Sequence, residues 1–223
     1  VGQSSKPFTV CFIGASNLEL PANATAARTL KDAAQSALGG EAFAEAAISE
    51  TNSPKDRTGI RGLYSGGTLA AETQLILLDA GLDVESNAAV PGAGSLSDDG
   101  NAHKIIDLGD DEYTQGRPHP MIDPEIRREP LAAALTDSTV GVVVIDIVIG
   151  YGAHPDPAGQ LTEMLSTMQG KDSPTIIASV TGTEKDPQVR SSQIKSLQAA
   201  GIHVAGSNAD AAIAALNILG INS

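Results

Sequence analysis

Short runs of β-branched and aliphatic residues alternate with helical stretches along most of this chain, and this alternation limits its possible folds more than any other feature. The residue types predict strands at 60–64, 84–89, 103–108, 140–149, 175–180 and 202–205. Helical stretches separate most of them, at 68–80, 124–136, 157–169, 187–200 and 208–219. Strands joined by helices of this length form βαβ units. We therefore expect an α/β fold with a mostly parallel sheet.

The strand predicted at 140–149 is continuously apolar except for Asp146. Such a run is typical of a parallel strand that is covered on both faces. A carboxylate inside it must be hydrogen-bonded or protonated, because an unpaired buried charge is costly. A functional role and a bracing role for Asp146 are equally compatible with the sequence.

The first part of the chain is predicted to be organised separately from the rest. Residues 8–13 are predicted to form a strand and residues 22–38 an Ala-rich helix, and the stretch that follows, up to residue 59, is polar and loop-like. We place a strand–helix unit at 1–40, a linker at 41–59 and the main domain at 60–223.

Charge and cysteine content exclude several classes of partner. The 223 residues include 27 acidic residues against 14 Lys and Arg, a net charge of −13. This balance argues against nucleic acid and anionic membrane surfaces as partners. Cys11 is the only cysteine, so no internal disulfide can form and a cytoplasmic location is expected. No stretch approaches the ~20 apolar residues of a membrane span.

The loops that follow the predicted strands contain most of the candidate binding residues. These loops lie at the carboxyl edge of a parallel sheet, where such sheets bind their ligands. We expect a small-molecule site there, with substrate-binding residues Asp110, Tyr151, Gly152, Thr181, Gly182 and Thr183. Three helices are predicted to begin at Asp-Pro pairs, 123–124, 156–157 and 186–187, because Asp is a good N-cap and Pro suits the next position.

A glycine turn, Ser65-Gly66-Gly67-Thr68, joins a predicted strand to a predicted helix. The free amides and the dipole of a helix start favour an anion, and two glycines allow a ligand to approach closely. An anion site and a plain tight turn are equally compatible with this spacing. Glu72 lies on the same helix face as Thr68 and either orients a group at the turn or is simply an acid near the helix start.

The segment from 98 to 128 is rich in charged residues. Arg117 and His119 are two residues apart in a loop stiffened by glycine and proline, and they form the best candidate catalytic or binding pair. Arg binds phosphate or carboxylate through a bidentate fork. Arg127 and Arg128 are predicted to lie on a helix surface. The acidic residues of this segment lack fixed ligand spacing, so no metal site is expected.

Four segments in this order resemble the carboxyl-terminal part of FdrA proteins, within the superfamily of the succinyl-CoA synthetase α-subunit. They are RGLYSGGTLAAE (61–72), IIDLGDDEYTQGRPHPMIDPEIR (105–127), DIVIGYGAHPDPAG (146–159) and SVTGTEKDPQ (179–188). The resemblance implies a three-layer, flavodoxin-like CoA-ligase domain, and it implies that residues 1–40 are the remnant of a preceding domain. In the ligases, the turn matching Ser65–Thr68 and the acid matching Glu72 contact a phosphorylated histidine.

That histidine lies in a Gly-His-Ala-Gly segment of the ligases, where this chain has Thr181-Gly182-Thr183. FdrA proteins share this departure. The resemblance therefore implies a subunit of an oxamate carbamoyltransferase of allantoin and purine breakdown, which moves a carbamoyl group between oxamate nitrogen and phosphate. Phosphate or carbamoyl phosphate would be a substrate, and other subunits or the missing amino-terminal domains would be partners. An acyl-CoA ligase or CoA-binding module and a non-catalytic interaction subunit are the alternatives.

Overall fold

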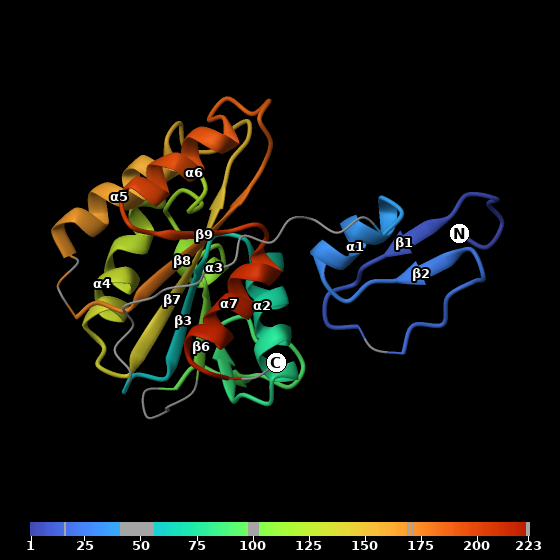
Figure 1. Cartoon of the computed structure of the whole chain (residues 1–223), viewed down its shortest axis with the longest axis horizontal. Helices are drawn as coiled ribbons and strands as arrows, with labels where there is room; N and C mark the ends of the chain where they lie inside the picture. Colours follow the sequence, from blue (N-terminus) through green and yellow to red (C-terminus); the bar gives the residue numbers. More distant parts are fainter. Residues whose placement is uncertain (16, 41–55, 98–102, 169, 171, 222–223) are drawn as a thin grey trace.

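A computed structural model describes the chain except for residues 16, 41–55, 98–102, 169, 171 and 222–223 (Figure 1). Its main sheet has seven parallel strands in the order β5-β4-β6-β3-β7-β8-β9. The strands are β3 (Gly59–Tyr64), β4 (Val84–Ser86), β5 (Gly94–Ser95), β6 (His103–Asp107), β7 (Val140–Val148), β8 (Thr175–Thr181) and β9 (His203–Ala205). The expected parallel α/β sheet is confirmed.

Helices cover both faces of this sheet and make three layers (Figure 1). One face carries α2 (Gly67–Asp79) and α7 (Asn208–Ile218), and the other carries α4 (Arg128–Thr136), α5 (Pro157–Met168) and α6 (Arg190–Ala199). Two short helical turns, α3 (Asp111–Thr114) and the 3-10 turn η1 (Pro124–Arg127), lie between β6 and α4. The fold is the expected three-layer, flavodoxin-like one.

Strand β7 shows why the sheet needs cover on both faces. Successive side chains of a strand point to opposite faces. Val142 and Val144 belong to the core beneath α2 and α7, whereas Val143 and Ile145 belong to the core beneath α4, α5 and α6. All four are fully buried, and burial of each such side chain stabilises the fold by about 1.5–3 kcal/mol. Asp146 continues the series that faces α2.

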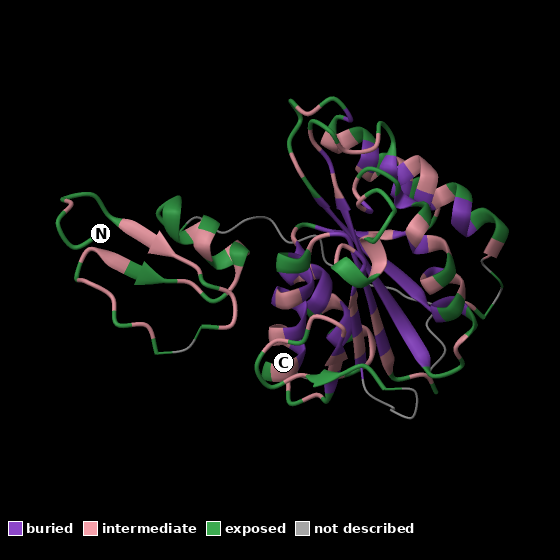
Figure 2. Cartoon of the chain, turned by 180° about the vertical axis from the view of Figure 1, so that it is seen from behind, coloured by how far each residue is buried: buried purple, intermediate pink, exposed green. Residues whose placement is uncertain are grey.

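The described part of residues 1–40 contains a two-stranded sheet and a helix. β1 (Phe8–Val10) and β2 (Ala24–Ala26) pair in parallel, and α1 (Leu30–Ala37) follows. The helix predicted at 22–38 is therefore wrong in its first half, because Thr29 closes a capping box with Asp32 and starts the helix at Leu30. α1 has no buried residue, and Figure 2 shows that buried residues gather in the main domain.

Polar contacts join this unit to the helices α2 and α7. Arg28 forms an ion pair with Asp79 of α2, and Lys31 Nζ lies 2.5 Å from Asp210 Oδ1 of α7. The division of the chain at 1–40 and 60–223 stays a prediction, and most of the predicted linker lies outside the described residues.

Several helix boundaries follow from local capping. Asp156 Oδ1 accepts a hydrogen bond from the amide of Gly159 at the start of α5, and Asp123 Oδ1 accepts one from Glu125 at η1, as predicted. The third predicted cap is wrong, because Asp186 bonds back to Thr183 and α6 begins only at Arg190. None of the helices in the described ranges is long and apolar enough to cross a membrane.

Candidate functional site at the carboxyl edge of the sheet

Neighbouring strands β3 and β7 send the chain to opposite faces of the sheet. β3 continues into α2 on one face, and β7 continues into α5 on the other. In open parallel sheets, the crevice beyond the carboxyl ends of such a strand pair is the usual place for a ligand. The Ser65–Thr68 turn follows β3 at this point, and the loops after β6 and β7 lie beside it. These segments define the candidate site.

The first two amides of the glycine turn hold a carboxylate of the chain itself. The Ser65 amide donates to Asp146 Oδ1 at 2.7 Å, and the Gly66 amide donates to Asp146 Oδ2 at 2.9 Å. Asp146 is completely buried. The sequence left an anion site and a plain turn open, and the structure combines them, because the turn binds an anion that is internal. The amides of Gly67 and Thr68, next along the chain, are the first of α2.

Arg127 neutralises this buried carboxylate. Its Nη2 donates to Asp146 Oδ1 at 2.9 Å, to the Asp146 carbonyl oxygen at 3.1 Å and to Ser65 Oγ at 2.7 Å. Burial raises the pKa of Asp146 and lowers that of Arg127, and the ion pair opposes both shifts. The prediction that Arg127 lies on a helix surface is wrong, since only 2% of the residue is exposed. The sequence allowed either a functional or a bracing role for Asp146, and these contacts favour the bracing role.

A second carboxylate, Asp107, ends strand β6 beside the same turn. It is 8% exposed, and its Oδ1 accepts a hydrogen bond from the Gly109 amide at 2.9 Å. Its Oδ2 lies 2.6 Å from the position that a Cβ on Gly67 would take. Sequence reasoning counted Asp107 only as one acid in a charged segment. Its position as the last residue of a strand, two residues before a glycine, was the available signal.

His119 packs against the same point. Its Nε2 lies 2.7 Å from the position of a Cβ on Gly109, and Asp107 Oδ1 lies 3.1 Å from that position. The Met121 amide donates to His119 Nδ1 at 3.2 Å. This hydrogen bond requires an unprotonated Nδ1 and so favours the neutral ring with its proton on Nε2. The imidazole therefore presents a donor next to Asp107.

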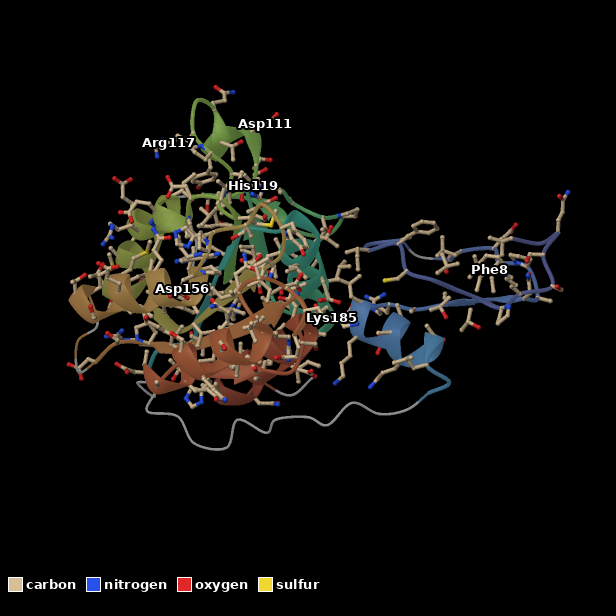
Figure 3. All side chains as sticks on the ribbon, turned by 90° about the horizontal axis from the view of Figure 1, so that it is seen from above. Phe8, Asp111, Arg117, His119, Asp156 and Lys185 are labelled. Carbon is tan, nitrogen blue, oxygen red and sulfur yellow. The ribbon has the colours of Figure 1, made fainter. Side chains whose placement is uncertain are left out.

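Arg117, the predicted partner of His119, lies farther out on the same loop (Figure 3). It is exposed and lines a cavity of about 300 Å³ together with Pro118, Asp123, Glu125, Ile126, Arg128 and Glu129. His119 is not part of this lining. The structure therefore places the two residues in neighbouring but separate environments, with an arginine that is open to a solvent-borne anion.

The loops after β7 and β8 are held together by one glutamine. Gln188 donates to the carbonyl oxygens of Gly150 and His154, each at 3.0 Å, and accepts the Gly150 amide at 3.1 Å. Tyr151 in this loop is 91% exposed, and Gly152 has a positive φ of 85°. The loop is thus anchored at its base and presents an aromatic ring to solvent.

The turn Thr181–Thr183 also binds an internal carboxylate. Asp186 Oδ2 accepts the amide of Thr183 at 2.5 Å and its hydroxyl at 3.0 Å. Gly182 has a φ of 147°, and a Cβ there would lie 2.2 Å from Ile149 Cγ1. As at the first turn, donors predicted to hold a substrate are engaged by an aspartate of the chain.

Glu72 lies one helical turn after Thr68 in α2 and faces α1 and α7. Its Oε1 accepts the Leu30 amide at 2.6 Å, and its Oε2 accepts Asn208 Nδ2 at 2.8 Å. Only 2% of the residue is exposed, and burial raises the pKa of its carboxyl group. Glu72 thus connects the first unit of the chain to the main domain.

The other described acids of the charged segment make contacts within their own loops. Asp110 is the N-cap of α3, where its Oδ1 accepts the amide of Glu112 at 3.0 Å. Asp98 and Asp99 lie outside the described residues. No group of three or more potential ligand residues able to hold a metal ion occurs in the part of the chain that the structure describes.

The three-layer fold is consistent with a CoA-ligase-like domain, and comparison with known families identifies the family. The model of the family described as CoA-ligase matches residues 63–218, so the chain belongs to the CoA-ligase family. The Escherichia coli K12 protein YahF, described as uncharacterized, is 36% identical over 164 residues, which cover 70% of this chain and 32% of YahF. The chain therefore spans about a third of the length of that relative.

Among solved structures, the crystal structure of PH0766 from Pyrococcus horikoshii OT3 is similar, with a TM-score of 0.42 and 12% sequence identity. The similarity covers 74% of this chain and 35% of PH0766.

Proposed function

We propose that this CoA-ligase-family chain is the FdrA-like part of a carbamoyl-transfer enzyme, which moves a carbamoyl group between oxamate nitrogen and phosphate. The four FdrA-like segments support the proposal, because each of them contributes residues to the carboxyl edge described above. The relative YahF has no activity in its description, so the proposal depends on the chemistry of this edge.

The observation that carries the proposal is the position of His119. His119, whose Nδ1 accepts the Met121 amide, lies with its Nε2 against Gly109 next to Asp107. The other oxygen of Asp107 lies against Gly67, where the Gly67 and Thr68 amides begin α2. Donors fixed in this way stabilise the oxyanion that develops when a carbonyl carbon is attacked. The turn Thr181–Thr183 contains no histidine, so a phospho-histidine relay has no residue there. Direct attack of phosphate on a carbamoyl carbon needs only the donors named above, which are His119 Nε2 and the amides of Gly67 and Thr68.

The remaining candidate residues divide between this step and its surroundings. Arg117 would hold the phosphate or the substrate carboxylate at the rim, through its bidentate fork. Tyr151 and Gly152 would close over the substrate from the loop after β7, and Asp110 would flank it from the start of α3. Glu72 would not touch the substrate, because its two oxygens accept hydrogen bonds from Leu30 and Asn208. It would support the site only by holding α1 and α7 against α2.

Partners and location belong to the same proposal. A chain that spans a third of its relative is expected to work with further domains or subunits, and the single cysteine is consistent with a cytoplasmic enzyme. The anionic surface makes nucleic acid and membranes poor partners.

A CoA-binding module or acyl-CoA ligase is the second candidate, and membership of the CoA-ligase family favours it. For this candidate, the chain must bind CoA even though the turn at 181–183 contains no histidine. In the third candidate, a non-catalytic interaction subunit, this edge would bind none of the small ligands.

A thermal-shift titration with carbamoyl phosphate, phosphate, oxamate and CoA separates these candidates. A ligand at 100 times its Kd adds about 2.7 kcal/mol, which raises Tm by roughly 5–10 °C for a chain of this size. A shift with carbamoyl phosphate or oxamate but not with CoA supports carbamoyl transfer. A shift with CoA alone supports the second candidate, and no shift with any of them contradicts a binding site within this chain.

Variants at the edge add a second test. Arg117→Ala and His119→Ala should weaken carbamoyl phosphate binding, with Lys185→Ala and His203→Ala as matched controls for charge and ring. Lys185 is an exposed cation on another carboxyl-edge loop, and His203 lies in β9. Full turnover of the assembled enzyme with both Arg117→Ala and His119→Ala would overturn these assignments.

A further inference from the structure

Two glycines make room for the carboxylate of Asp107. A Cβ on Gly67 would lie 2.6 Å from Oδ2, and a Cβ on Gly109 would lie 3.1 Å from Oδ1. Real side chains essentially never come as close as 2.6 Å, so any residue other than glycine at 67 would displace the carboxylate. The turn and the loop after β6 therefore fit around Asp107 rather than merely passing near it.

The backbone of Asp107 is held on both sides by one side chain. Asn87 Oδ1 accepts the Asp107 amide at 2.9 Å, and Asn87 Nδ2 donates to the Asp107 carbonyl oxygen at 2.9 Å. The residue also ends a strand that pairs with β3. A group placed on a strand end and fixed by a second layer of hydrogen bonds has the precision that a reacting group needs.

The two carboxylate oxygens differ in their partners. Oδ1 accepts the Gly109 amide at 2.9 Å, whereas no group within the described ranges of the chain donates to Oδ2. Oδ2 lies against Gly67, the first residue of α2, whereas Oδ1 and His119 Nε2 both lie against Gly109. One oxygen is thus fixed, and the other is available to a proton or a ligand.

We propose that Asp107 is a catalytic residue of this site, which transfers a proton between phosphate and the leaving nitrogen of an N-carbamoyl amide while His119 holds the carbonyl oxygen. This inference rests on the proposed carbamoyl transfer and deepens it, because it names the acid–base group and the class of donor substrate.

The step balances without a further reactant. An oxygen of monohydrogen phosphate forms a bond to the carbamoyl carbon, and the carbonyl oxygen becomes an oxyanion that accepts the Nε2 hydrogen bond of His119. The bond between the carbamoyl carbon and the amide nitrogen then breaks. The phosphate proton passes to Oδ2 of Asp107 and from there to the departing nitrogen. The products are carbamoyl phosphate and the free amide, and Asp107 returns to its starting state.

The surroundings of Asp107 suit this exchange. Burial raises the pKa of Asp107, the Gly109 amide lowers it, Asp110 and Asp146 raise it, and His119 lowers it, with a net shift upward. Acid–base catalysis is most efficient when the pKa of the group approaches the working pH. The carboxyl group is therefore a better proton carrier than an exposed aspartate would be.

The test replaces Asp107 by Asn in the assembled enzyme, with Asp111→Asn as the matched control. Asp111 is an exposed acid on the same loop, at the first position of α3. Asp107→Asn should lower kcat by about 10²–10⁴-fold, the usual contribution of a positioned acid–base group, with KM for phosphate changed far less. Asp111→Asn should keep the wild-type kcat. The residual activity of Asp107→Asn should also lose the acidic limb of the wild-type pH profile.

The outcomes separate this inference from the proposed function. An active wild type together with full kcat in Asp107→Asn would overturn the role of Asp107 and leave carbamoyl transfer standing. A wild type without phosphate-dependent carbamoyl transfer would overturn both.

A measurement without turnover covers the case in which Asp107→Asn fails to fold. In ¹³C NMR of the side-chain carboxyls of the wild type and of His119→Gln, the Asp107 signal should titrate at a higher pH in the variant, because the charged form of His119 lowers the pKa of Asp107. His203→Gln is the control. An identical Asp107 titration in wild type and His119→Gln would refute the coupling of the two groups.

Discussion

Replacing Asp146 by Asn tests the conclusion that the glycine turn is closed by an internal anion. The change keeps the shape of the side chain and removes its charge. The Arg127 guanidinium, 2% exposed and 2.9 Å from Asp146 Oδ1, would then be buried without a counter-charge. One of the two amides that now donate to the carboxylate, those of Ser65 and Gly66, would face an NH₂ group instead of an acceptor.

The expected cost follows from the burial of the pair. Removing one partner of a buried ion pair costs about 3–5 kcal/mol. At roughly 2–4 °C per kcal/mol for a domain of this size, Tm should fall by about 6–20 °C. Urea unfolding should show a lower midpoint with an unchanged m value, since the surface exposed on unfolding stays the same.

The matched control is Glu125→Gln, which removes a carboxylate from Arg128. Those two side chains are 47% and 41% exposed, so solvent screens the pair and its contribution to stability is small. Its Tm should change by no more than about 2 °C. The double variant Arg127→Met with Asp146→Asn should lose less than the sum of the single losses, because the unpaired charge is gone. A loss in Asp146→Asn no larger than in Glu125→Gln would refute the reasoning.

Three further predictions concern the same fold. Gly109→Ala should lower the free energy of unfolding in urea by about 1–3 kcal/mol, because the new Cβ would lie 2.8 Å from the Ser65 carbonyl oxygen. The control Gly94→Ala, whose Cβ would have its nearest atom at 3.7 Å, should lose far less. Equal losses in the two variants would contradict this prediction. Burial raises the folded-state pKa of Glu72, so wild type should lose stability relative to Glu72→Gln as pH rises from about 4.3, the unfolded value, through the folded value. Thermal melts across this range check it, and a pH-independent Tm difference would exclude it. Removal of residues 1–40 should leave the main domain folded by circular dichroism, since α1 buries no residue, and loss of the sheet signal would refute the domain boundary.

Local sequence signals predicted the parts of the fold that depend on neighbouring residues. The apolar run at 140–149 predicted the central strand β7. Two Asp-Pro pairs cap their helices. The third does not, because Asp186 bonds to Thr183 and competes with helix formation. The start of α1 was placed too early for a similar reason, since an Ala-rich stretch favours a helix until a cap such as Thr29 fixes its start.

The candidate site was only partly predictable. The sequence placed the candidate site at the carboxyl edge of the sheet and selected His119, whose Nε2 lies against Gly109 beside Asp107. It missed Asp107, and it placed Arg127 on the surface, because an arginine in a short helical segment is usually exposed. Glu72 was predicted to act at the turn, and its two hydrogen bonds to Leu30 and Asn208 depend on residues more than forty positions away.

The sequence by itself predicted most strands of the main sheet, the helices between them and the sheet edge that carries the loops, because these depend on residue type and spacing. Only the tertiary structure decided which charges meet. Ser65 and Asp146 are 81 positions apart, and Arg127 reaches both from a third element. Whether a donor faces a substrate or a carboxylate of the same chain depends on the pairing of β3 with β7, and this pairing is fixed by the packing of the whole sheet.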